Sequence, residues 1–145
     1  MKLEAVDMTV FWVDFIEQFM KASTSKMNLT MAHCRFCITE WPDSAMTPIN
    51  KVDIIHCRYN AVDFGCLMLM TSPKQLRIYG AYNGDLNTIF GFIACMENVC
   101  TIVLYDLVNT QFLDVADKRA LESLVRALVI RGKPTNLTFN GDEFS

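Results

Sequence analysis

The chain has 145 residues, a length typical of one domain, with apolar residue types making up 52% and charged types 20% of the sequence. This balance excludes intrinsic disorder and fibrous repeats, so we expect one compact core. The net charge is −3 and the charges form no long basic runs, which argues against nucleic acid as a partner.

The sequence shows no stretch suited to membrane insertion and no secretory signal. Residues 86–93 are too short to cross a bilayer, and residues 8–20 are interrupted by Asp14 and Glu17. The amino terminus carries acidic residues where a signal peptide would carry basic ones. We therefore expect a cytoplasmic protein without membrane insertion, whose six cysteines are reduced thiols, several of them buried.

An amphipathic helix is predicted near the amino terminus, because apolar residues recur every three or four positions after Asp7. Its apolar face contains Met8, Phe11, Trp12, Phe15, Ile16, Phe19 and Met20. Such a face either covers the core or forms a subunit contact. In the second case a homodimer would form through Phe11, Trp12 and Phe15.

Strands are predicted in the segments that follow this helix. Apolar and polar residues alternate over residues 32–38, and strand-like runs cover residues 52–59 and 64–70. From residue 76 onward, a strand at 76–80, a helix at 86–97, a strand at 100–105, a helix at 116–130 and a strand at 137–139 are expected. This alternation calls for right-handed crossovers and a parallel or mixed sheet.

The predicted fold is therefore α/β or α+β, with a single mixed sheet and helices packed on it. We expect one domain over residues 1–145. Residues 1–60 would supply the N-terminal helix and strands, and residues 61–145 a βαβαβ unit. No internal repeat is evident at this level.

Four residues offer a set of metal ligands, namely Cys34, Cys37, His56 and Cys57. In a strand, residues three apart and direct neighbours point to opposite faces, and neither pair has the tight turn that a zinc site needs. We therefore expect structural thiols, with no metal and no cofactor. The alternative is a small metal-binding protein or enzyme that uses these four residues.

Catalytic motifs are not found. The sequence lacks a G-x-S-x-G elbow, a phosphate-binding loop, an H-E-x-x-H pair and a G-x-G-x-x-G turn. A carboxylate pair, Asp114 and Asp117, has a spacing that is more typical of a helix cap than of acid–base catalysis.

A family resemblance covers about the last seventy residues. The segments Leu76-Arg77-Ile78-Tyr79-Gly80-Ala81-Tyr82-Asn83, Thr101-Ile102-Val103-Leu104-Tyr105-Asp106-Leu107 and Thr110-Gln111-Phe112-Leu113-Asp114 carry it. They resemble the STAS family, the sulphate-transporter and anti-sigma-factor-antagonist domains. The likeness lies in the spacing of Gly80, Asp106-Leu107, Phe112-Leu113-Asp114, Leu121, Leu124 and Gly132.

The resemblance implies a function and a binding surface. Regulated members carry a phosphorylatable Ser or Thr after the aspartate, where this chain has Val115, so phosphorylation of that turn is not expected. The implied function is that of a non-enzymatic regulatory or scaffold protein that acts through protein–protein binding. A further alternative is a viral or host-interaction protein with an unrelated α/β fold. The implied partner-binding residues are Asp114, Val115, Ala116 and Asp117, with Asn83 and Asp85 nearby.

Overall fold

The computed structural model describes residues 1–23, 26–43, 46–108 and 114–144. In this part of the chain the helices are α1 (Val10–Ala22), α2 (Ala61–Thr71), α3 (Leu86–Ala94) and α4 (Val115–Ile130). The strands are β1 (Lys2–Glu4), β2 (Asp7–Met8), β3 (Asn28–Ala32), β4 (Arg35–Phe36), β5 (Lys51–Ile55), β6 (Gln75–Tyr79), β7 (Thr101–Tyr105), β8 (Asn136–Phe139) and β9 (Asp142–Phe144).

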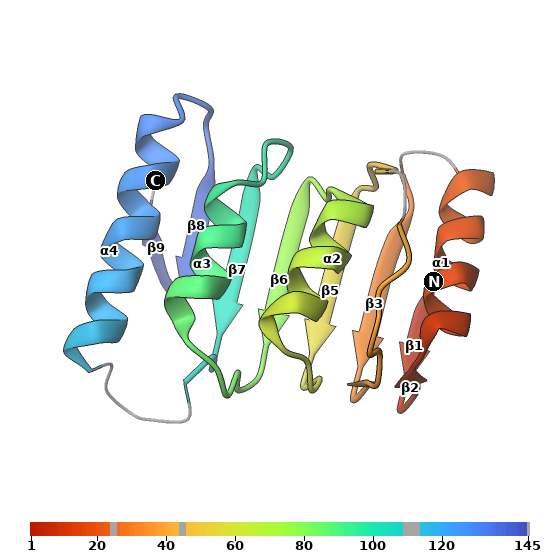
Figure 1. The fold of residues 1–145 in the computed structure, drawn as a ribbon. Coiled ribbons are helices and arrows are strands. Elements are labelled where there is room, and N and C mark those ends of the chain that lie inside the picture. The colour runs from red at the N-terminus through yellow and green to blue at the C-terminus, as the bar shows by residue number, and fades with distance from the viewer. Residues whose placement is uncertain (24–25, 44–45, 109–113, 145) are drawn as a thin grey trace.

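One seven-stranded sheet organises the molecule, with the strand order β1-β3-β5-β6-β7-β8-β9 (Figure 1). Its first six strands are parallel, and β9 pairs with β8 in the antiparallel direction. The short strands β2 and β4 form a separate parallel pair. The four described helices all pack on the same face of the sheet. The predicted α/β fold with a mixed sheet is confirmed.

The sheet is built as a solenoid, since its strands lie in chain order and every return segment crosses the same face. Successive parallel strands begin at residues 2, 28, 51, 75, 101 and 136. A helix returns the chain to the sheet in four of these crossovers. Between β4 and β5, an extended segment does so instead, and its described residues, 37–43 and 46–50, form no helix.

The turn that ends each parallel strand explains why the units stack. The residue directly after each strand has a positive φ; these residues are Ala5, His33, His56, Gly80, Asp106 and Asn140. The turn keeps the hydrogen-bond ladder intact, since the His33 N–H donates to the Ile55 carbonyl at 2.9 Å and the His56 N–H donates to the Tyr79 carbonyl at 2.7 Å. In the first five of these turns the positive-φ residue sends the chain out of the sheet, whereas Asn140 begins the hairpin that leads to β9.

An internal repeat accompanies this stacking, which corrects the expectation that none exists. The tetrapeptides His33-Cys34-Arg35-Phe36 and His56-Cys57-Arg58-Tyr59 follow β3 and β5 at equivalent positions. Before each, two buried apolar residues alternate along the strand. The identity is confined to these few positions, because return segments of different length and structure separate the strands.

Four of the predicted elements were wrong in type or extent, and one of them is the helix predicted at 86–97, which ends at Ala94. Residues 64–70 belong to α2 and not to a strand, because Asn60 and Asp63 form a capping box and an unbroken apolar run has no period that separates strand from helix. The strand predicted at 52–59 ends at Ile55, where the chain turns at His56. The strand predicted at 32–38 divides into the end of β3 and the short β4.

The core lies between the helices and the sheet. In α1 the buried residues are Val13, Ile16 and Met20, whereas Phe11 and Phe15 are 68% and 45% exposed. The expected apolar face of this helix therefore points only partly inward. In the described part of the chain, no helix is long and apolar enough to cross a membrane.

Candidate functional site: the open sheet face

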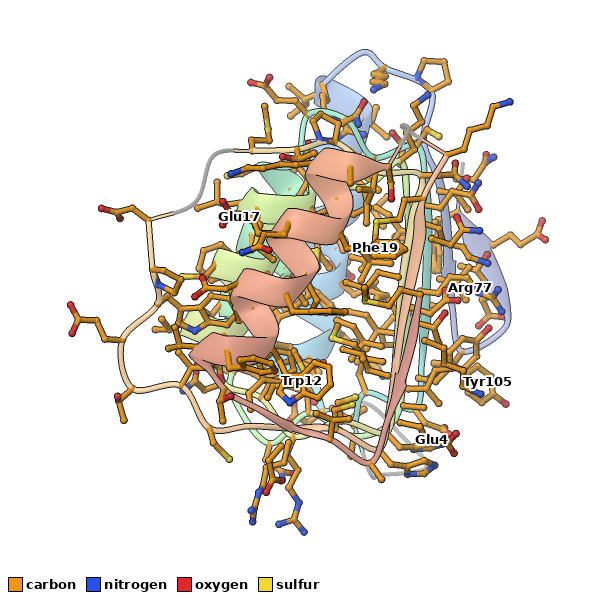
Figure 2. All side chains as sticks on the ribbon, turned by 90° about the vertical axis from the view of Figure 1, so that its right-hand side faces the viewer. Glu4, Trp12, Glu17, Phe19, Arg77 and Tyr105 are labelled. Atoms are coloured by element: carbon orange, nitrogen blue, oxygen red, sulfur yellow. The ribbon has the colours of Figure 1, made fainter. Side chains whose placement is uncertain are left out.

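The face of the sheet opposite the helices carries side chains in rows, because paired residues of neighbouring strands point to the same side. Figure 2 shows Arg77 and Tyr105 on this side, pointing away from the helices. In the described part of the chain no helix covers it. We call it the open face. Its two central rows are Lys2, Thr30, Asp53, Arg77, Val103 and Thr138, and then Glu4, Ala32, Ile55, Tyr79 and Tyr105.

A charged cluster centres on Asp53, which is only 7% exposed although it lies on the open face. Lys51 Nζ lies 3.6 Å from Asp53 Oδ2, and Arg77 Nε lies 3.8 Å from Asp53 Oδ1. The Thr30 hydroxyl donates to Oδ2 at 3.4 Å. The two cations cover the carboxylate, which explains how a charge can be buried there.

Two tyrosines extend this cluster along the next row. Arg77 Nη2 donates to the Tyr79 hydroxyl at 3.0 Å, and its guanidinium carbon lies 5.4 Å from the centre of the same ring. The hydrogen bond to Tyr79 raises the pKa of Arg77, and Asp53 adds to this. The Tyr79 and Tyr105 rings lie 6.1 Å apart, and Tyr105 is 44% exposed. Contacts within the chain therefore fix Arg77 and Tyr79 against each other.

The open face carries groups that are suited to recognition. Neither central row contains a histidine or a cysteine. Among the described residues no group of three or more histidine, cysteine or acidic side chains could hold a metal ion. The open face instead offers aromatic surface, cations and one shielded carboxylate, which are groups typical of protein interfaces.

The residues implied by the STAS resemblance lie elsewhere, at the starts of α3 and α4. Asp114 caps α4, because its Oδ1 accepts from the Asp117 N–H at 2.7 Å. Asp85 likewise caps α3 through the Asn87 N–H at 3.0 Å. Partial burial and the carboxylates of Asp114 and Asp85 raise the pKa of Asp117.

The two helix starts are therefore close enough to interact electrostatically. Asn83, Val115 and Ala116 are exposed beside them. Phe112 and Leu113 of the quoted motif lie outside the described residues.

The four metal-ligand candidates are not gathered at one point. Cys34 and Cys57 are buried, and their Sγ atoms donate to the Leu3 carbonyl at 3.5 Å and to the Met31 carbonyl at 3.3 Å. Cys37 and His56 are exposed. Burial raises the pKa of the Cys57 thiol to about 11, which keeps it neutral at physiological pH. These two buried thiols act as structural side chains between strands.

A separate apolar groove lies at the carboxyl-terminal end of the solenoid, between α4 and the β8–β9 hairpin. It is lined by Val125, Val129, Pro134, Leu137 and Phe144, among others. The groove shares none of these residues with the central rows of the open face.

The open face could not be recognised from catalytic or metal-binding motifs, because the residues of its central rows form none. A signal was present in the strands. Arg77 and Tyr79 alternate with the buried Leu76 and Ile78, so their outward orientation follows from the strand period. What the sequence did not reveal is that all helices of the described residues pack on the other side of the sheet.

Comparison with known proteins found no matching family model, no matching curated protein and no matching solved structure. The STAS resemblance and the binding turn that it implies therefore stay predictions.

Proposed function

We propose that the chain is a non-enzymatic protein-binding module, regulatory or scaffolding in role, whose partner contacts the open face. The observation that carries the proposal is the set of Arg77, Tyr79 and Tyr105 side by side on a sheet face that no helix of the described residues covers. Tyrosine and arginine are enriched at the centres of protein interfaces, where single residues supply much of the binding energy.

The rigidity of these side chains supports the proposal. Arg77 is already fixed by Tyr79 and by Asp53, so a partner would not have to bear the full entropic cost of ordering it. The pattern of a buried carboxylate between Lys51 and Arg77 would select a partner with complementary charges. The same groups give the face its specificity as well as its affinity.

The repeat architecture supports the same reading. The residues Leu29, Met31 and Cys34, and again Val52, Ile54 and Cys57, follow a spacing similar to that of leucine-rich repeats. In such repeats, stacked strands form an extended sheet. Solenoid proteins use the extended surfaces that their stacked repeats create for binding.

The test compares variants of the open face with a variant on the helix side. Tyr79→Ser combined with Tyr105→Ser should reduce recovery of the principal partner from source cells at least about tenfold, since two aromatic contacts of about 1–2 kcal/mol each are lost. Leu69→Ser is the control, because Leu69 is 71% exposed on α2. Unchanged recovery with the double variant, at unchanged circular dichroism, would refute the proposal.

The STAS-like turn predicts a different outcome for a different variant. Ala116 is exposed in the first turn of α4, between Val115 and Asp117, so Ala116→Arg should leave the fold intact. If this variant loses the partner while the tyrosine variant retains it, the turn is the binding surface. If the open face is the surface, the reverse result is expected.

A second candidate function is self-association through Phe11, Trp12 and Phe15. It is favoured by the exposure of Phe11 and Phe15 and by the position of α1 at the end of the solenoid, beside the edge strand β1 (Figure 1). We expect sedimentation of the wild type to show a dimer and that of Phe11→Gln with Phe15→Gln a monomer. Val129→Gln, at an exposed position of α4, should leave the dimer unchanged. A monomeric wild type would exclude this candidate.

A further inference from the structure

The two His-Cys-Arg-aromatic tetrapeptides stack on each other residue by residue. The imidazoles of His33 and His56 are stacked, with ring centres 5.6 Å apart and an angle of 18° between their planes. Arg35 pairs with Arg58 in a parallel bridge. Phe36 and Tyr59 meet edge to face with ring centres 6.5 Å apart.

Packing in the core explains only two of the four residues in each tetrapeptide. The cysteines are buried and the aromatic rings pack against the core, so they stabilise the stack. The arginines and histidines are exposed. Two like charges placed directly opposite each other in a sheet destabilise the pair. The contact of one arginine with the other therefore does not stabilise the stack, whereas a ligand with two negative charges would offset the repulsion between them.

The neighbouring row shows which ligand an arginine at this position takes. Asp7 of β2 pairs with Arg35 of β4, so in the first unit an aspartate stands where the next two units have arginines. Arg35 Nη2 lies 3.3 Å from Asp7 Oδ2, and this contact raises the pKa of Arg35. The chain thus binds one carboxylate of its own on this row.

The other arginine of the row has no such partner. Within the described part of the chain, Arg58 makes no ion pair with a carboxylate. The unmatched positive charge lies on a chain whose net charge is −3. Guanidinium groups bind carboxylates through two parallel hydrogen bonds, a geometry that a free exposed Arg58 can adopt.

We propose that Arg35 and Arg58, flanked by the exposed His33 and His56, form a binding site for an acidic peptide segment. One carboxylate of the segment pairs with Arg58, and a second displaces Asp7 from Arg35. Arg35 of β4 and Arg58 face each other in an isolated bridge, where paired backbones lie about 4.8 Å apart, so the segment needs two carboxylates close together. The site shares no residue with the central rows of the open face, so it can be tested independently of the proposed function.

The test is a titration of the full chain with a hexaglutamate peptide, followed through the NMR signals of the arginine side chains. We expect saturable shifts at Arg35 and Arg58. Arg58→Gln should weaken binding about tenfold, since the two charge-assisted hydrogen bonds to one carboxylate are lost. Asp7→Asn should strengthen binding, because it frees Arg35. The control is Arg126→Gln, which removes an exposed arginine on α4.

Three results would overturn the proposal. The first is equal weakening by Arg58→Gln and Arg126→Gln, which would mean binding to net charge alone. The second is unchanged or weaker binding by Asp7→Asn. The third is binding of inorganic phosphate without binding of hexaglutamate at the same ionic strength, which would identify the ligand as a phosphate group.

Discussion

Gly80 gives His56 the space in which its imidazole lies. A Cβ atom at Gly80 would be 2.6 Å from His56 Nδ1 and 3.0 Å from the His56 Cα. Gly80 also has a φ of +110°, a backbone conformation that residues other than glycine rarely adopt. The strand-end turn of one unit is therefore shaped to fit the turn of the unit before it.

Gly80→Ala should destabilise the fold by about 1–3 kcal/mol, through backbone strain and displacement of His56. Gly91→Ala is the matched control, because Gly91 lies in α3 and a Cβ there meets nothing within 4 Å. That change should stabilise the chain by about 0.5–1 kcal/mol, as expected for a helix interior. Urea unfolding measures both. Equal effects of the two substitutions would contradict the turn geometry.

Asp63 is expected to be the most sensitive polar residue of the core. It is 3% exposed, its Oδ2 accepts from the Asn60 N–H at 3.0 Å, and its Oδ1 accepts from the Trp41 indole at 2.9 Å. Asp63→Ala should cost about 2–4 kcal/mol, because the Asn60 N–H and the partly buried Trp41 indole N–H both lose their acceptor, while the cap made by the Asn60 side chain stays. Trp41 fluorescence follows the unfolding. The exposed Asp43 provides the control, and a similar loss with Asp43→Ala would argue against this network.

Leu124 and Arg126 test the inward face of α4. Leu124 is 2% exposed, whereas Arg126 is exposed. Leu124→Ala should lower the free energy of unfolding by about 2–5 kcal/mol through the cavity it leaves. Arg126→Ala should change it by about 0.5 kcal/mol or less. If both variants unfolded at the same denaturant concentration, the assigned face of the helix would be wrong.

Thiol reactivity should separate the cysteines by burial. In the cytoplasmic location that the sequence predicts, all would be reduced. An aromatic disulfide reagent should modify the exposed Cys37 quickly and the buried Cys34 and Cys57 only on unfolding. In the Cys57→Ala variant, fast modification of Cys34 would indicate a loosened stack. In the wild type, fast modification of both Cys34 and Cys57 would contradict their burial.

Stability should decline in alkaline solution. Burial raises the pKa of Cys57 from 9.0 to about 11, so the folded chain binds this proton more tightly than the unfolded chain does. The contribution of this Cys57 proton to the free energy of unfolding is complete below pH 9 and is lost as the pH rises toward 11. Burial also raises the pKa of Tyr59, in the same sense. Urea unfolding between pH 8 and 11 should show a shallower decline for Cys57→Ala; an identical slope would exclude this cause.

The sequence predicted much of the carboxyl-terminal half correctly, because its helices and strands have distinct periods. The strand at β6, the helix at α4 and their capping residue Asp114 all follow from local pattern. The α2 segment did not, since an apolar run next to the Asn60 cap fits either structure. Periodicity resolves an element only where polar residues mark its other face.

The candidate site was harder to predict than the fold. Arg77 and Tyr79 could be placed on one face of a strand from alternation alone. Their role depends on the strands beside them, which bring Asp53 and Tyr105 into contact. The register between strands is a tertiary property, and here it follows from turns such as the one at His56. The positive φ of His56 could not be predicted from its residue type.

Site-specific photo-cross-linking tests the central claim, that the partner sits on the open face, most directly. A photoreactive phenylalanine analogue would replace Tyr105 on the open face, Leu69 on α2 or Val115 on the STAS-like turn, in otherwise wild-type chains. The account predicts an adduct with the principal partner from position 105, lost on Arg77→Glu, and none from the other two positions. An adduct from position 69 or 115, with none from position 105, would contradict it.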